Sequence, residues 1–184
     1  MVDASYLQDP GESHLQQSAF EGLFVKVLKV DGDFARELKD AGFDPARQQP
    51  LYPSPVFKAC IEIACRRLYP DRPTPEAMRL LAAQFVDGFF DTIVGKVVVV
   101  VLPLLSADAF LKRYPRFFGM AAPGVKMTME KESEGHWRVV LRDRAPLPDF
   151  NAGVFECLLP RFGVKPQVKV VEQSRWHFVL SITW

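Results

Sequence analysis

The chain has 184 residues, enough for one domain with a substantial core. Its hydrophobic content of 48% and charged content of 24% exclude a disordered chain. Its net charge of +1 excludes the strong basic surplus of a general nucleic-acid binder, so no nucleic-acid partner is expected.

The first part of the chain is polar and rich in turn signals. Residues 1–17 include Asp-Pro-Gly at 9–11, and we expect them to form a mobile tail. The remaining residues, 18–184, are expected to form a single domain. Its first element is a short helix over 20–28, although residues 24–30 also alternate as a strand would.

Three further helices are predicted next. Residues 34–41 form a small helix that Gly42 ends. Ser54-Pro55 and Thr74-Pro75 each combine an N-cap residue with proline at the first helical position. They begin helices over 54–69 and 74–94.

The 74–94 helix is the element around which the rest of the fold is organised. Its polar side carries Glu76, Arg79, Asp87 and Asp91. Its apolar side must be buried against other elements, and it consists of Met78, Leu81, Ala82, Phe85, Phe89 and Ile93.

The run over 96–105 has two interpretations. Five consecutive valines favour a strand, whereas the helical frame that precedes them and Pro103 favour a helix, which is our prediction. The run is too short to span a bilayer, so no membrane span is expected. After it, Ser106 caps a helix that Gly119 is expected to terminate.

From Pro123 onward the pattern changes to strands. Alternating residues over 125–130 and 137–141 flank a turn and predict a hairpin. Asp149 is expected to cap the next helix, and two more alternating strands follow it. The fold class predicted is therefore α+β, with an N-terminal helical bundle packed beside a hairpin–helix–hairpin unit that forms a four-stranded antiparallel sheet.

The spacing of several small and apolar residues resembles a known family of proteins. The pattern consists of Tyr52-Pro53, Tyr69-Pro70, Glu76-Ala77, Gly88 through Thr92 to Gly95, and then Gly153, Glu156 and Gly163. It is similar to an uncharacterised, many-paralogue family of about this length that is restricted to myxobacteria. The resemblance runs from about Phe20 to the C-terminus and implies a shared fold, not a reaction.

The second half more distantly resembles the superfamily of haem–nitric-oxide-binding domains, vinyl-reductase-type domains and TRAPP-class trafficking subunits. That resemblance implies an apolar cavity between a helical bundle and a hairpin–helix–hairpin unit. Haem-binding members use a helix-borne histidine and a Tyr-x-Ser-x-Arg motif. The segment Tyr52-Pro53-Ser54-Pro55-Val56 lacks the arginine, and no histidine occurs from Ser54 to Phe118. We therefore expect no haem, other cofactor or metal.

Isolated polar residues give no catalytic pattern. Strand alternation places His136 and His177 on solvated faces, and His14 lies in the tail. Glu156 lies among apolar residues, but one polar position per turn is typical of a half-exposed helix. Without a recognisable constellation, no enzyme is predicted.

The cysteines predict a reduced, buried state. Cys60, Cys65 and Cys157 are odd in number and have no paired spacing, and no signal peptide precedes them. We therefore expect a cytoplasmic protein in which these thiols pack in the interior.

We predict a non-enzymatic module that binds or senses an apolar small molecule. The chain has an excess of phenylalanine, 15 residues, and seven of them lie in the 74–94 helix and the C-terminal unit. The residues expected to line the pocket are Phe57, Phe85, Phe89, Ile93, Phe155 and Cys157. The alternative is a scaffold that forms a homodimer or binds a partner protein through its helical face, where Leu80 and Phe90 lie toward the polar side.

Overall fold

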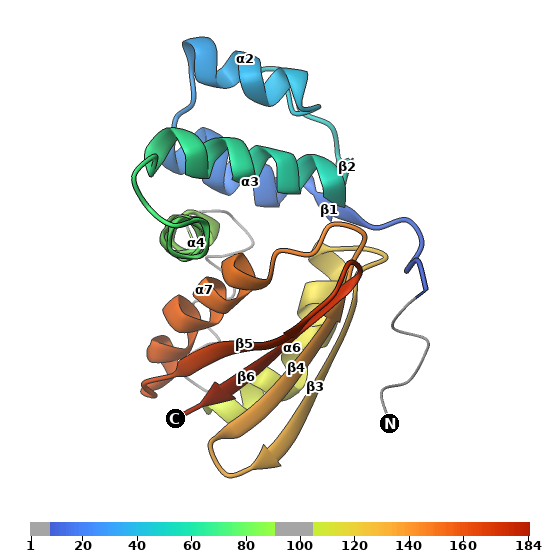
Figure 1. Ribbon diagram of the computed structural model, residues 1–184, viewed down its shortest axis with the longest axis vertical. Coiled ribbons are helices and arrows are strands. Elements are labelled where there is room, and N and C mark those ends of the chain that lie inside the picture. Colours follow the sequence, from blue (N-terminus) through green and yellow to red (C-terminus); the bar gives the residue numbers. More distant parts are fainter. Residues whose placement is uncertain (1–7, 91–104) are drawn as a thin grey trace.

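The computed structural model describes residues 8–90 and 105–184. Helices occupy the first part of the chain, and a hairpin, a helix and a second hairpin follow (Figure 1). The predicted α+β class is confirmed.

The N-terminal part contains short elements that lie beside one another. β1 (His14–Gln16) runs directly into α1 (Gln17–Phe20) and the π-helix η2 (Glu21–Val27). α2 (Gly32–Asp40) follows, and β2 (Leu51–Pro53) pairs with β1 in an antiparallel ladder. The sequence places the first residue of the domain at 18, whereas pairing begins at residue 14. Ser13 is already buried.

Longer helices follow in the chain. These are α3 (Ser54–Leu68), α4 (Thr74–Phe90) and α6 (Ala107–Ala121). In Figure 1, α3 lies below α2, and α4 is seen nearly end-on beneath α3. Among the described residues, no helix is both long and apolar enough to cross a membrane.

Two predicted helix boundaries differ from those observed. Gly119 does not terminate α6, which continues to Ala121. Glycine is conformationally permissive, so it can adopt helical backbone angles as well as the left-handed angles that end a helix. Asp149 does not cap α7 (Pro148–Leu158), whose N-cap is Leu147, and its carboxylate pairs with Arg79 instead. The predicted helix over 96–105 falls almost wholly outside the described residues.

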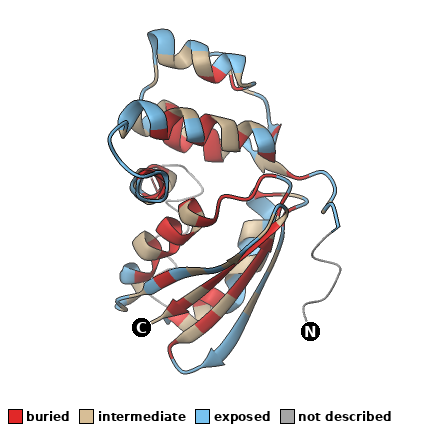
Figure 2. Ribbon diagram, viewed as in Figure 1, coloured by how far each residue is buried: buried red, intermediate tan, exposed pale blue. Residues whose placement is uncertain are grey.

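The four-stranded antiparallel sheet has the order β3-β4-β6-β5. β3 (Lys126–Ser133) and β4 (His136–Arg142) form the first hairpin, and β5 (Gln167–Gln173) and β6 (His177–Thr183) form the second. The inner strands β4 and β6 carry most of the buried positions (Figure 2). α7 and the 3₁₀ turn η4 (Leu159–Phe162) connect the hairpins, so the helix returns over the sheet.

Glycines allow α4 to approach its neighbours closely. A β-carbon at Gly153 of α7 would lie 2.7 Å from Arg79 Cα and 2.8 Å from Ala82 Cβ of α4. A β-carbon at Gly88 of α4 would lie 2.6 Å from Val27 Cγ2. The α4–α7 pair is the most extensive helix–helix contact in the described part of the chain. The two helices can therefore pack this closely only because Gly153 has no side chain.

We predict that Gly153→Ala destabilises the fold by about 1–3 kcal/mol, because the added methyl overpacks the α4–α7 contact. Gly119→Ala is the matched control, since nothing lies within 4 Å of its β-carbon position in α6. Alanine there should leave the stability unchanged or raise it by up to about 1 kcal/mol. Urea unfolding of both variants measures the difference. Equal losses in the two variants would contradict close packing at Gly153.

Candidate functional site

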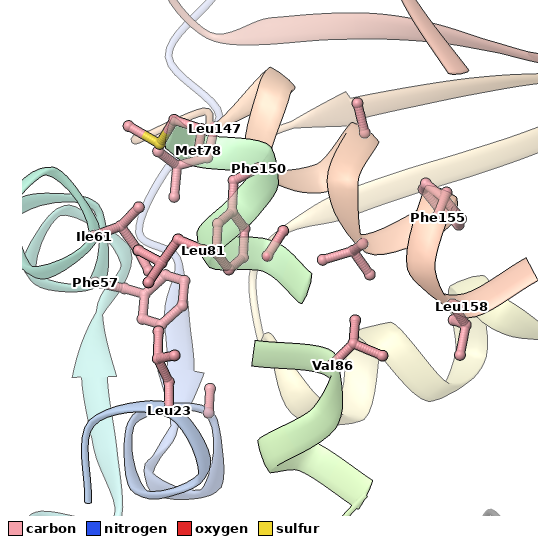
Figure 3. Packing of buried hydrophobic residues seen from close by; sticks show 14 of the residues in the cluster. Leu23, Phe57, Ile61, Met78, Leu81, Val86, Leu147, Phe150, Phe155 and Leu158 are labelled. Carbon is pink, nitrogen blue, oxygen red and sulfur yellow. The ribbon is translucent and has the colours of Figure 1, made fainter. Parts of the chain in front are cut away.

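An apolar cavity of about 190 Å³ is lined mainly by residues of α4, α6 and α7. The remaining lining residues include some from the start of α3, from β1 and from the β4–α7 connector. In Figure 3, Val86 of α4 faces Leu158 of α7, and both side chains line the cavity.

Aromatic side chains dominate the wall. Phe57, Phe85 and Phe150 contact one another edge-on, with ring centroids 5.3–6.1 Å apart. Tyr114 of α6 packs on both Phe110 and Phe118. Nine lining residues are aromatic: Phe57, Phe85, Phe89, Phe90, Phe110, Tyr114, Phe117, Phe118 and Phe150. Rings of this size form a wall with few rotatable bonds, which favours a preformed site.

The residues expected in the pocket are only partly brought together. Phe57, Phe85 and Phe89 line the cavity. Ile93 lies outside the described residues. Phe155 and Cys157 are not among the lining residues, because the cavity face of α7 carries Phe150, Val154 and Leu158 at helical spacing. Phe155 is buried on another face of α7, against Tyr114.

α6 contributes wall residues that were not predicted from the sequence. Phe110, Tyr114, Phe117 and Phe118 all line the cavity. Their i, i+4 spacing was the available signal, but it is equally typical of ordinary core packing. Phe90 also lines the cavity and is only 8% exposed, so its expected place on the polar side of α4 was wrong.

A small polar cluster interrupts the apolar wall. The Ser54 hydroxyl donates to Asp143 Oδ1 at 2.7 Å, and the Ser13 hydroxyl donates to the same oxygen at 2.6 Å. Ser54 and Asp143 line the cavity, whereas Ser13 lies behind them. Ser54 was expected to cap α3, but its hydroxyl makes no capping hydrogen bond and bonds to Asp143 instead.

The two strand histidines do not lie on solvated faces as predicted. His177 is 3% exposed, with Nδ1 2.6 Å from Ser174 Oγ and Nε2 2.7 Å from Glu172 Oε1. It is buried because β6 is an inner strand flanked by β4 and β5. His136 is half-buried beside Ser181 and Glu132. Neither histidine lines the cavity.

Glu156 is part of an ion cluster between α4 and α7. It bonds to Arg79, which also contacts Asp149 Oδ1 at 3.3 Å. Burial nevertheless raises the pKa of Glu156 above its ordinary value, against the lowering effect of Arg79. Glu156 does not line the cavity, and Arg79, expected on the exposed side of α4, is half-buried.

The surroundings of the three cysteines disfavour the thiolate form. Burial raises the pKa of Cys60 to about 12 and that of Cys65 to about 11. Burial also raises the pKa of the half-buried Cys157. Nucleophilic chemistry requires a thiolate, so these environments disfavour it. Across residues 8–90 and 105–184, no group of three acidic, histidine or cysteine side chains could hold a metal ion.

The sequence over residues 14–184 matches the family model described as "Protein of unknown function (DUF2378)". The chain belongs to the DUF2378 family. No curated protein sequence matches it.

Solved structures show that the DUF2378 chain shares the fold of H-NOX domains. One is an oxygen-binding H-NOX domain related to soluble guanylate cyclases, in its oxygen complex. Its TM-score is 0.65 at 14% identity, covering 91% of this chain and 94% of that one. Another is a mutant of T. tengcongensis H-NOX. It has a TM-score of 0.64 at 14% identity, covering 91% of this chain and 97% of that one.

A third structure comes from work on haem redox potential and protein-induced porphyrin distortion. It has a TM-score of 0.67 at 13% identity and covers 92% of this chain and 100% of that one. At identities this low, the structural similarity establishes the fold of the DUF2378 chain and nothing about its ligand.

The residues of the cavity do not fit haem. Among the described residues, no histidine, cysteine or methionine lines it, and Tyr114 is the one lining residue of the types that usually hold haem iron. The sequence of 91–104 adds no histidine, cysteine or methionine. Burial raises the pKa of Tyr114, which disfavours the phenolate that such a bond needs. No lysine or arginine among the described lining residues could pair with propionates.

We predict a specific pH dependence for Glu156→Gln. Because the folded-state pKa of Glu156 is raised, the native state binds its proton more tightly than the unfolded chain does. The wild type should therefore lose stability, relative to the glutamine variant, as pH rises through that raised pKa. Urea unfolding of both proteins from pH 4 to 8 measures this difference.

The control is Glu76→Gln, which removes an exposed pair with Arg72 and should change stability by about 1 kcal/mol or less at every pH. A stability difference between wild type and Glu156→Gln that does not change with pH would mean that Arg79 cancels the effect of burial, and a reversed dependence would mean that Arg79 outweighs it.

Proposed function

We propose that this chain is a non-enzymatic module that binds a small, largely apolar molecule in the cavity between α4, α6 and α7. The observation that carries the proposal is the cavity itself, about 190 Å³ with nine aromatic side chains in its wall. An engineered apolar cavity of about 150 Å³ binds benzene, so this space is sufficient for a single-ring compound.

The shared fold supports the same conclusion. The oxygen-bound H-NOX domain is a small-molecule-binding protein of the same architecture. Because the wall of this cavity does not suit haem, the DUF2378 chain is proposed to hold an organic ligand directly against its phenylalanine and tyrosine rings.

The titratable groups support binding rather than catalysis. Asp143 and Tyr114 are the titratable side chains among the described lining residues. The hydrogen bonds recorded for Asp143 come from serine hydroxyls on the protein's own chain. No hydrogen bond between two titratable groups is found in the described wall, although such pairs are common in sites of general acid–base catalysis.

The alternative, a scaffold that acts through its helical face, has weaker support. Leu80 is 40% exposed, but Phe90 is buried and Arg161 lies over its ring at 4.1 Å. Of the two residues expected at that face only Leu80 is exposed, and a scattered apolar residue is ordinary on a protein surface.

We predict that toluene or indole stabilises the wild-type chain. A ligand at 100 times its Kd stabilises the folded state by about 2.7 kcal/mol, which raises Tm by roughly 5–10 °C for a chain of this size. Val154→Phe adds a ring at the cavity wall of α7 and should remove this response. Differential scanning fluorimetry with increasing probe concentrations measures both effects.

The matched control is Ile61→Val, a buried change in α3 away from the cavity wall. It should lower Tm slightly, because Ile→Val costs about 0.5–1.5 kcal/mol, and should keep the full ligand response. A wild type that does not respond to either probe, or a Val154→Phe variant that folds and responds fully, would contradict the proposal.

A further inference from the structure

A carboxylate in the cavity wall has no cationic partner among its recorded hydrogen bonds. Asp143 is 8% exposed, and the two groups that donate to it are the neutral hydroxyls of Ser13 and Ser54, which are 3% and 2% exposed. Both hydroxyls donate to Oδ1. Among the described hydrogen bonds, none is made to Oδ2 of Asp143, so this oxygen can accept one from a ligand.

The arginines on either side of Asp143 bond to other groups. Arg142 Nη2 donates to the carbonyl oxygen of Gln8 at 3.3 Å. Arg144 Nη2 pairs with Asp9 Oδ2 at 3.3 Å. A buried carboxylate that receives only neutral hydrogen bonds is costly to desolvate, and a cation placed beside it offsets that cost. The start of α3, at Ser54, contributes only the partial positive charge of a helix N-terminus.

The remainder of the wall also suits a cation that carries an aromatic ring. Aromatic faces attract ammonium groups, and rings pack against one another edge-on or offset. Phe57 and Phe150 line the same cavity as Asp143, and the aromatic side chains of α4 and α6 extend that surface. One cavity thus combines a buried anion with a large aromatic surface.

We propose that the ligand of this cavity is a small aromatic amine in its protonated form, with its ammonium group on Asp143 and its ring among the phenylalanines. This inference rests on the proposed binding function and adds the chemical class of the ligand. The volume of about 190 Å³ fits one ring with a short aminoalkyl chain, since about 150 Å³ is enough for benzene.

A purely structural role for Asp143 gives a different expectation. Its hydrogen bonds join the segment before β1, the start of α3 and the β4–α7 connector, so it also holds these parts together. If that were its only role, removing the charge would lower stability and leave ligand preference unchanged. Preference among ligands of equal shape is therefore the readout that separates the two roles.

The experiment compares three probes of matched shape by isothermal titration calorimetry at pH 7: phenethylamine, propylbenzene and 3-phenylpropionate. We expect the wild type to bind phenethylamine at least tenfold more tightly than propylbenzene and to reject the anion. Asp143→Asn should lose this preference while keeping its affinity for propylbenzene. Ile61→Val is the control, since this buried change lies away from the cavity wall and should keep the preference.

The outcomes separate this inference from the proposed function. Equal or tighter binding of propylbenzene by the wild type, or an amine preference that survives in Asp143→Asn, would overturn the amine assignment and leave the cavity as a binding site. Binding of none of the three probes would overturn both. If Asp143→Asn does not fold, the affinities of the wild type for the three probes still decide whether the cavity prefers a cation. Loss of phenethylamine binding in Val154→Phe shows that the amine binds in this cavity.

Discussion

The close approach of α4 to its neighbours is the contact on which the rest of this structure depends. At Gly153 the backbone of α7 lies against Arg79 and Ala82, and at Gly88 the backbone of α4 lies against η2. These contacts fix α4 between the N-terminal helices and the C-terminal unit. Further along α4 and α7, the larger residues Phe85, Phe89, Val154 and Leu158 line a cavity instead of closing it. The same pair of helices, α4 and α7, thus makes the glycine contact and lines the cavity.

The cavity joins two kinds of surface that proteins usually separate. Its aromatic wall would by itself suit any apolar compound, whereas the carboxylate of Asp143 discriminates by charge. The serines that bond to Asp143 come from residues 13 and 54, so the N-terminal segment and α3 position a group that belongs to the C-terminal unit. In H-NOX domains the same fold is associated with haem and oxygen. Here the described wall has no histidine, cysteine or methionine that could hold the iron.

The regular elements were readable from the sequence, whereas most of the site was not. Alternation over 125–141 and 168–182 identified both hairpins, because strands with one buried face carry a strong period-two signal. The same rule failed for His177, since an inner strand can bury both of its faces. Asp143 lies in a connector without periodicity, and its burial depends on residues 89 and 130 positions away in the chain. No local pattern encodes such contacts.

The most direct test of the account is whether a ligand enters this cavity in solution. Methyl-detected NMR of the wild-type chain, titrated with toluene, reports on the wall residue by residue. We predict saturable shifts of the methyl groups of Val86, Val154 and Leu158, and none for Ile61, which is buried away from the cavity. Unchanged wall methyls at high toluene concentration, or shifts confined to exposed residues such as Val171, would contradict it.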